Sequence, residues 1–248
     1  MEAAIHKQNR ILETKDLNVF YRDYHGGGGR KKQVLYDVSC HIDRGEVLGL
    51  VGESGSGKSS LAKAIIGINK NYNGEIKLDG KAAMVFQDPY GSLNPAYKVS
   101  WLLQEPLRVQ GGYSRDEMKA KAAEMLELVG LGPRYADRLP SQLSGGQRQR
   151  VCIGIALMQE PELLIADEPV SALDVTIQAQ ILKLLDELRE KLGISILFIS
   201  HDLRVVYNVC SRVMIMKNGR VVEEGSCDKV YFTPENGYTK ALLRSAGI

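Results

Sequence analysis

A glycine-rich turn near residue 55 constrains the fold of this chain more than any other stretch. Residues 52–59 read Gly-Glu-Ser-Gly-Ser-Gly-Lys-Ser and fit the pattern GxxxxGK[ST]. An apolar run at 47–50 precedes this turn, and a helix-forming run at 61–66 follows it. In such a strand–turn–helix unit, glycines let backbone N–H groups surround an anion, and the helix N-terminus adds positive potential. The stretch therefore predicts a phosphate-binding loop in an α/β fold.

Two side chains of the loop have specific predicted tasks. Lys58 would reach the β- and γ-phosphates of a nucleotide, and the Ser59 hydroxyl would be a ligand of Mg²⁺. The predicted nucleotide-binding residues of this stretch are Gly52, Glu53, Ser54, Gly55, Ser56, Gly57, Lys58, Ser59 and Ser60.

Composition narrows the class of protein. The 248 residues are 44% apolar and 25% charged, as expected for a globular protein with an ample core. A net charge of +2 gives no reason to expect a nucleic-acid or lipid surface. The four cysteines form no CxxC pair, which argues against a zinc or disulfide framework and suits a reducing cytosol. No signal peptide and no membrane-spanning run is recognised, so any membrane role is expected to come through a partner.

The remaining pattern alternates strands with helices and predicts a mainly parallel sheet covered on both faces. Residues 26–32 read as an exposed hairpin loop, and Asn218-Gly219 predicts a two-residue hairpin. Residues 88–158 change texture and read as an inserted helical subdomain. The expected strands are 11–21, 35–42, 74–78, 82–86, 163–166, 194–199, 212–217 and 220–224, and the expected helices are 61–66, 99–109, 114–129, 147–158 and 175–192.

Polar residues follow three of the apolar runs. Asp167 and Glu168 follow the run at 163–166, and Gln87 and His201 stand at the ends of two others. Carboxyl ends of parallel strands form the ligand edge of an open sheet. Glu168 would orient a water, Gln87 would touch Mg²⁺ or that water, and His201 would bond the γ-phosphate or the water. The predicted catalytic residues are Glu168, His201 and Gln87, and the predicted metal ligands are Ser59, Gln87 and Asp167.

A second anion-binding helix start is predicted at residues 143–147, Leu-Ser-Gly-Gly-Gln. Ser144 is a good N-cap, and Gly145 and Gly146 leave backbone N–H groups accessible. One nucleotide cannot obviously use both this stretch and the phosphate-binding loop within one chain. The economical hypothesis is a head-to-tail dimer, in which each such stretch closes on the γ-phosphate held by the partner.

In order and spacing, these motifs resemble those of an ABC-transporter ATPase subunit. Residues 52–59 match Walker A, 143–147 the signature and 163–167 Walker B, while Gln87 matches the Q-loop and His201 the switch histidine. The resemblance implies a P-loop (RecA-like) α/β ABC ATPase core with an antiparallel β subdomain and an inserted α-helical subdomain. Residues 1–248 would be a single ABC ATPase domain, with 1–87 and 159–248 as core and β subdomain and 88–158 as the helical subdomain.

The resemblance also implies site residues and ligands. ATP and Mg²⁺ are the expected ligands. Residues 171–174 match the D-loop. An aromatic side chain upstream of Walker A is expected to stack on adenine, and Tyr21 is chosen with Phe20 as its rival. The residues expected to contact the partner's nucleotide are Ser144, Gly145, Gly146, Gln147 and Asp174.

Residues 85–95, 166–182 and 233–243 resemble the oligopeptide/dipeptide/nickel importer subfamily, with Asn236-Gly237 replacing a His-Pro pair. This resemblance implies uptake of a small solute, either a peptide or nickel or another metal chelate. It further implies a second ABC ATPase subunit in a homo- or heterodimer, two transmembrane permease subunits, and indirectly a substrate-binding protein. The chain would be peripheral on the cytoplasmic face of the bacterial plasma (inner) membrane.

The alternative is a non-transport ABC ATPase, associated with DNA repair or translation. Repair members insert long coiled coils between Walker A and the signature, and the interval from Ser59 to Leu143 is too short for them. Translation members usually carry two cassettes, whereas this chain has one. The signature and the D-loop oppose a third reading, a phosphate-loop kinase outside the family.

Overall fold

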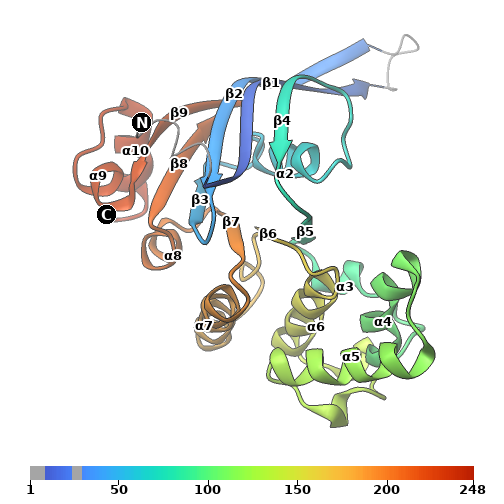
Figure 1. The fold of residues 1–248 in the computed structure, drawn as a ribbon. Helices are drawn as coiled ribbons and strands as arrows, with labels where there is room; N and C mark the ends of the chain where they lie inside the picture. The colour runs from blue at the N-terminus through green and yellow to red at the C-terminus, as the bar shows by residue number, and fades with distance from the viewer. Residues whose placement is uncertain (1–8, 24–29) are drawn as a thin grey trace.

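The computed structural model describes residues 9–23 and 30–248 and arranges them in two sheets surrounded by helices (Figure 1). The strands are β1 (Arg10–Asp23), β2 (Arg30–Asp43), β3 (Val47–Val51), β4 (Tyr72–Leu78), β5 (Ala82–Val85), β6 (Leu163–Asp167), β7 (Ser195–Ser200), β8 (Arg212–Lys217) and β9 (Arg220–Ser226). The helices are α2 (Lys58–Ile65), α3 (Pro89–Ser92), α4 (Val99–Gln110), α5 (Arg115–Leu128), α6 (Gly145–Leu157), α7 (Val175–Leu192), α8 (Leu203–Val209), α9 (Cys227–Phe232) and α10 (Gly237–Ser245). The predicted strands and helices are confirmed, with shifts of a few residues at their ends.

The larger sheet has six strands in the order β5-β6-β7-β3-β8-β9. The first five strands are parallel, and β9 returns antiparallel to β8 through the Asn218-Gly219 turn. Gly219 has a φ of +77° and Asn218 of +49°, the left-handed backbone that such a turn requires. The prediction of a mainly parallel sheet with a hairpin edge is confirmed.

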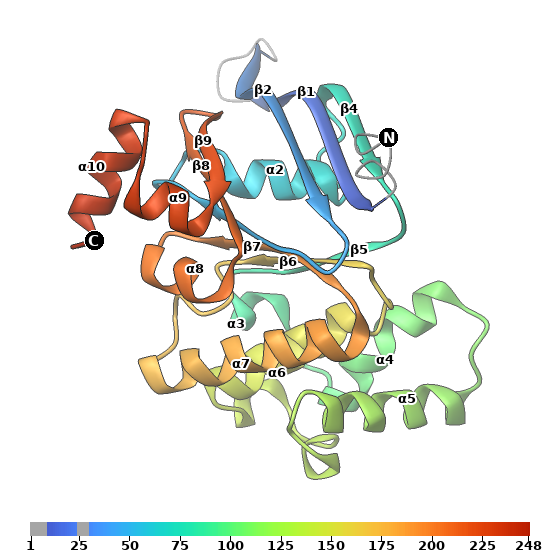
Figure 2. The ribbon, with the colours of Figure 1, turned by 60° about the vertical axis from the view of Figure 1, so that its left-hand side comes forward.

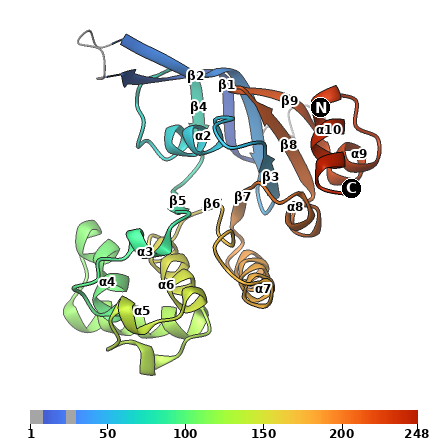
Figure 3. The same ribbon diagram turned by 180° about the vertical axis from the view of Figure 1, so that it is seen from behind.

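Alternate residues of the central strands face two separate cores. On β3, Leu48 and Leu50 point to the side of α2 and the smaller sheet, whereas Val47 and Val51 join the core formed with α6, α7 and α8. Both sets are almost fully buried. Because each strand of a doubly covered sheet buries both faces, its sequence is continuously apolar instead of alternating. Figures 1 and 3 show α2 and the smaller sheet on one side of the six strands.

The smaller sheet has the order β2-β1-β4 and is antiparallel throughout. The expected hairpin loop at 26–32 is wrong at its basic end, because residues 30–32 belong to β2. Lys32 is the register partner of Tyr21, and Lys31 is the partner of Arg22. Residues 26–29 of the expected loop lie outside the described residues.

Helices α3 to α6 form a layer beside the six-stranded sheet, next to α7 (Figure 2). Helix α5 begins at a capping box, in which Ser114 and Glu117 bond each other's backbone N–H groups. Helix α6 begins at Gly145, two residues before the expected start. The reason is a second capping box, in which Ser144 and Gln147 bond each other's backbone in the same way. The proposed subdomain boundaries at residues 87 and 159 stay a prediction.

Three short helices near the C-terminus were not predicted. Helices α8, α9 and α10 have 7, 6 and 9 residues, too few for helical periodicity to be recognised. Each begins at a capping side chain, namely Asp202, Ser226 and Asn236. Helix α8 is the most consequential of the three because it begins immediately after the candidate His201.

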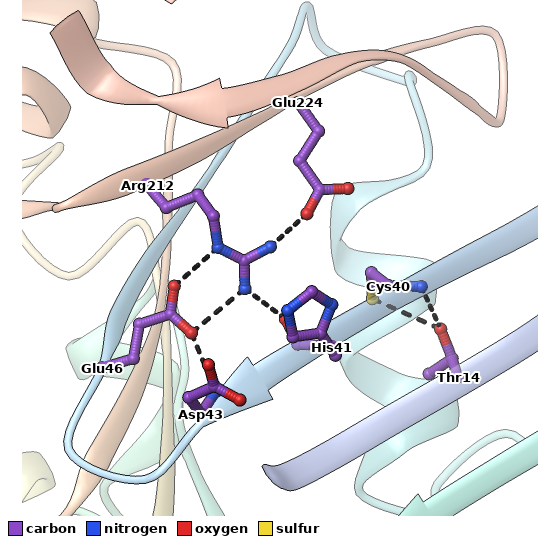
Figure 4. Close-up of polar contacts among 7 residues, drawn as sticks. All are labelled: Thr14, Cys40, His41, Asp43, Glu46, Arg212 and Glu224. Atoms are coloured by element: carbon purple, nitrogen blue, oxygen red, sulfur yellow. Dashed lines mark hydrogen bonds and ion pairs between the residues drawn. The ribbon is translucent and has the colours of Figure 1, made fainter. Parts of the chain in front are cut away.

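An ion network joins the two sheets at the amino-terminal ends of β3 and β8 (Figure 4). The Arg212 guanidinium donates to both carboxylate oxygens of Glu46, at 2.7 and 3.0 Å, and also pairs with Glu224. It donates in addition to the backbone carbonyl of His41 on β2, at 2.6 Å. Arg212 therefore ties the smaller sheet to the larger one, at the end of the strands opposite to the phosphate-binding loop.

The four cysteines, Cys40, Cys152, Cys210 and Cys227, are buried free thiols. Burial raises the pKa of Cys40 and Cys227 to about 11 and that of Cys152 to about 12. Across residues 9–23 and 30–248, no helix combines the length and apolar character that a membrane crossing requires.

Candidate active site

The candidate catalytic residues come together because the strands before them end at one edge of the sheet. Strands β5, β6, β7 and β3 are parallel neighbours, so their carboxyl ends coincide. Val51, the last residue of β3, is the register partner of Ser200, and Asp167 is the partner of Ile199. The phosphate-binding loop, Asp167, Glu168 and His201 thus follow from one edge, as expected for a ligand site on an open sheet.

The backbone of the phosphate-binding loop needs glycine at two positions for different reasons. Gly57 is the N-cap of α2 and has a φ of +111°, where a side chain would be strained. A Cβ atom on Gly52 would lie 2.2 Å from the Met216 carbonyl oxygen on β8. The loop therefore packs directly against the sheet. Helix α2 starts at Lys58, whose side chain reaches back across the loop.

Lys58 lies inside the curve of this loop. Its Nζ donates to the carbonyl oxygens of Gly52, at 2.7 Å, and of Glu53, at 3.0 Å. The side chain is buried, and burial lowers its pKa, although Glu168 and Asp167 act in the opposite direction. A cation held in a loop of backbone N–H groups is suited to bind polyphosphate.

Asp167 is the buried acidic residue of the site. Burial raises the pKa of its carboxyl, and the nearby Ser59 hydroxyl opposes that rise. The structure thus places two of the predicted metal ligands, Ser59 and Asp167, near each other. A hydroxyl beside a carboxylate is the hard-oxygen donor set that Mg²⁺ accepts when phosphate oxygens and water supply the other positions.

Glu168 has an unusual backbone at the end of β6. Its φ is +48°, in the left-handed region that non-glycine residues seldom adopt. Its N–H donates to the Ile199 carbonyl of β7 at 2.9 Å, which fixes that conformation. Strained backbone of this kind is concentrated at functional sites, where surrounding bonds hold a side chain in one direction.

The Glu168 carboxylate receives two neighbours at one oxygen. Gln87 Nε2 donates to Oε2 at 2.9 Å, and His201 Nδ1 lies 3.2 Å from the same atom. The three predicted catalytic residues are therefore in direct contact. Glu168 is 15% exposed and His201 61%, so the carboxylate is shielded while the imidazole meets solvent. A carboxylate oriented in this way can accept a proton from water.

Gln87 also lies where the sheet meets the helical layer. It follows β5 and precedes Asp88, whose side chain caps α3 by accepting the Tyr90 N–H at 2.8 Å. The guanidinium of Arg148, on α6, stacks 3.9 Å from the centre of the Tyr90 ring. A short path thus runs from Glu168 through Gln87 and the start of α3 to α6.

The residues expected to act on the partner's nucleotide form a separate group at the starts of α6 and α7. Asp174 caps α7 by accepting the Ile177 N–H at 3.0 Å. A Cβ atom on Gly146 would lie 2.5 Å from the Ile177 side chain, so this glycine also allows close helix packing, a reason that the sequence did not reveal. Among the described residues, no hydrogen bond joins residues 144–147 or Asp174 to residues 52–60.

The candidate adenine-stacking residues lie near the far end of β1. Tyr21 is 37% exposed, and Phe20 is half-buried with the Lys31 ammonium 5.9 Å from its ring centre. Both rings are accessible in part, and the choice of Tyr21 stays a prediction.

Comparison with known proteins identifies the family of this chain. The sequence profile of the ABC transporter family matches residues 35–171, which span the loop, Gln87, the signature and Glu168. The dipeptide transport ATP-binding protein DppF of Escherichia coli is 42% identical over 254 residues, covering 95% of this chain and 76% of the relative. The oligopeptide transport ATP-binding protein OppD of Bacillus subtilis is 44% identical, covering 95% and 72%.

Solved structures agree with the sequence comparison. The ATP-binding cassette MJ0796, in a dimeric post-hydrolysis state with ADP and phosphate, superposes with a TM-score of 0.76 at 30% identity, covering 87% of this chain and 98% of that one. The protein cbiO1 of Clostridium perfringens, part of an ABC transporter complex, gives 0.77 at 32% identity, covering 91% and 92%. The expected fold, a P-loop core with an antiparallel sheet and a helical insertion, is confirmed. The chain belongs to the ATP-binding subunits of the ABC transporter family.

Proposed function

We propose that the chain is the ATP-hydrolysing subunit of a membrane importer and that it couples ATP binding and hydrolysis to uptake of a small solute. One observation carries this proposal: Glu168, Gln87 and His201 meet at a single carboxylate oxygen, on the sheet edge that also holds Lys58. A shielded carboxylate beside a polyphosphate loop is suited to activate water against a γ-phosphate.

Different residues of the chain would bind the phosphates and activate the water. Lys58 and the N–H groups of residues 52–60 bind the phosphates and neutralise their charge. Glu168 holds the attacking water and takes its proton, while Gln87 and His201 fix the direction of the carboxylate. His201 also offers an exposed imidazole to the γ-phosphate. Positioning and charge stabilisation account for most catalysis of phosphoryl transfer, so the geometry of this group matters more than any single pKa.

The site also fits Mg²⁺, bound together with the nucleotide. Ser59 and Asp167, which lie near each other, would hold it, with the Gln87 amide oxygen as a third donor. When bound, Mg²⁺ would neutralise charge on the β- and γ-phosphates. Across the described residues, no group of three or more His, Cys, Asp or Glu side chains is placed to hold a metal. A site of one carboxylate and one hydroxyl completed by phosphate is the usual arrangement for Mg²⁺ with a nucleotide.

A second subunit would complete the site. The starts of α6 and α7 carry Ser144, Gly145, Gly146, Gln147 and Asp174, which make no hydrogen bond to residues 52–60 among the described residues and so are available to a partner in a head-to-tail dimer. A related cassette forms a dimer after hydrolysis. Sedimentation of Glu168→Gln with ATP tests this pairing, for which the expected result is a dimer. A strict monomer under those conditions would contradict pairing between two copies of this chain. A different ATPase chain would then be the partner to test.

The cargo proposed is a peptide. The relatives reported above are named for dipeptide and oligopeptide transport, which favours a peptide over nickel or a metal chelate. Two permease subunits would receive this chain on the cytoplasmic face of the bacterial plasma membrane, and a substrate-binding protein would deliver the cargo to them.

Uptake measurements in the source organism test the whole proposal. Cells carrying Glu168→Gln in place of the wild-type chain are expected to lose uptake of labelled di- and oligopeptides and to keep uptake of radioactive nickel. Loss of nickel uptake alone would mean that the cargo is nickel and not a peptide. Unchanged uptake of both, together with an ATPase-active wild-type protein, would support the non-transport alternative.

A further inference from the structure

The segment at residues 233–243, which stands out in the sequence without an assigned task, contacts the phosphate-binding loop. It contains α10, whose N-cap Asn236 accepts a hydrogen bond from the Tyr238 N–H at 2.8 Å. The Glu223 carboxylate on β9 accepts the backbone N–H groups of Glu235, at 2.7 Å, and of Asn236, at 3.1 Å. The start of α10 is therefore fixed on the edge strand of the six-stranded sheet.

Tyr238 is the residue of α10 that contacts the loop. Its hydroxyl oxygen accepts a hydrogen bond from the Glu53 N–H at 3.4 Å. The Lys217 ammonium, at the end of β8, lies 4.3 Å from the centre of the Tyr238 ring. A cation over an aromatic face stabilises the orientation of the ring, which keeps the hydroxyl directed at Glu53.

Glu53 connects this contact to Lys58. The carbonyl oxygen of Glu53 is one of the two that accept hydrogen bonds from Lys58 Nζ, at 3.0 Å. The N–H and the carbonyl of Glu53 flank one Cα atom, so a shift of this residue displaces a partner of the phosphate-binding lysine. At its other side the loop is held by the Gly219 N–H, which donates to the Ser56 carbonyl at 2.8 Å.

We propose that Tyr238 is a positioning residue for the phosphate-binding loop. It holds Glu53 from outside the loop, as Gly219 holds Ser56, and thereby keeps Lys58 and the loop N–H groups in the shape that binds polyphosphate. The inference rests on the proposed ATP-hydrolysing function. It adds a residue from the C-terminal helix to the machinery and gives residues 233–243 a role.

Tyr238→Phe tests the proposal because it keeps the ring and removes only the hydroxyl. Loss of one hydrogen bond that holds the loop is expected to raise the Kd for ATP about 2- to 10-fold. The melting temperature should stay that of the wild type, and the Glu53 amide proton should shift in a ¹⁵N–¹H spectrum. Tyr207→Phe is the matched control, since it removes a hydroxyl that donates to Asp228 at 3.1 Å. It should leave the Kd for ATP and the Glu53 amide signal unchanged.

The outcomes separate this inference from the proposed function. If the wild type binds ATP and Tyr238→Phe binds it equally well, Tyr238 is not a positioning residue. A raised Kd with an unmoved Glu53 signal and a lowered melting temperature would assign the hydroxyl to folding stability and would also overturn the inference. A wild-type protein that does not bind ATP would remove the proposed function, and the inference with it.

Discussion

His201 Nδ1 lies 3.2 Å from Glu168 Oε2, although the two residues follow different strands and no motif of the sequence spans both. The contact joins a shielded carboxylate to an imidazole that is largely exposed to solvent. Gln87 approaches the same oxygen from a third strand. The direction of the carboxylate is therefore set jointly by three strand ends, and disturbing any one of them should reach the chemistry through Glu168.

Replacing Glu168 with Gln should separate ATP binding from ATP hydrolysis. The amide keeps the shape of the side chain but cannot accept a proton, so turnover should fall about 10²–10⁴-fold, the usual contribution of a general base. ATP affinity should be retained, because the phosphates are bound by the loop. Phosphate release and fluorescent-nucleotide titration measure the two effects. Glu187→Gln, on an exposed face of α7, is the control, and ordinary turnover in Glu168→Gln would remove Glu168 from its role.

His201→Ala should lower turnover without abolishing nucleotide binding. The substitution removes a neighbour of the Glu168 carboxylate and a donor for the γ-phosphate, and loss of one such donor typically costs about 10²–10³-fold in rate. Steady-state ATPase assays and ATP titration give the two values. An ATPase rate equal to that of the wild type would return His201 to a structural role. His41→Gln, on β2 of the smaller sheet, controls for the loss of an imidazole.

Lys58→Ala should weaken nucleotide binding. A hydrogen bond from a charged group contributes about 1.5–3 kcal/mol, so the Kd for ATP should rise roughly 10- to 100-fold. Equilibrium titration measures the change, and Lys77→Ala on the exposed surface of β4 serves as the control. Unaltered affinity in the Lys58 variant would mean that its bonds to Gly52 and Glu53 shape the loop without contributing to phosphate binding.

Arg212→Met should destabilise the protein. It leaves the Glu46 and Glu224 carboxylates, 12% and 28% exposed, without their cation. Breaking a fully buried pair costs about 3–5 kcal/mol, and the residual exposure here lowers the expected loss to about 2–3 kcal/mol. Urea denaturation measures it. Arg189→Met, which loses more exposed pairs with Asp186 and Glu190, should cost less than about 1 kcal/mol. Equal losses in the two variants would contradict the special weight given to Arg212.

His41 should make stability depend on pH. Burial, together with the charges of Arg212 and Arg10, holds the pKa of its imidazole below the ordinary value of 6.5. As pH falls through 6.5, His41 becomes protonated in the unfolded chain while it stays neutral in the folded protein. The contribution is thus complete above that pH and is lost on acidification toward the folded-state pKa. His41→Gln should lower the difference in unfolding free energy between pH 7.5 and pH 5; an unchanged difference would show that His41 does not contribute.

The sequence predicted the elements of this fold better than their contacts. Continuous apolar runs identified β3, β6 and β7, since strands covered on both faces cannot alternate. The short helices α8 to α10 were missed because their register is set by packing on the sheet, not by their own periodicity. At the site, the order of motifs identified Glu168, Gln87 and His201 separately. Their meeting at one oxygen depends on the positive φ of Glu168 and on the neighbour relation of β5, β6 and β7, which no local pattern encodes.

The burial of all four cysteines makes this protein convenient for site-specific labelling. A thiol whose pKa lies near 11 or 12 is protonated at neutral pH, and only the thiolate reacts with maleimides. A reporter cysteine placed on the exposed surface of α5 and another on α7 should therefore be modified selectively in the wild-type background. Distances between two such probes would follow the helical layer through the ATP cycle, with no native cysteine removed.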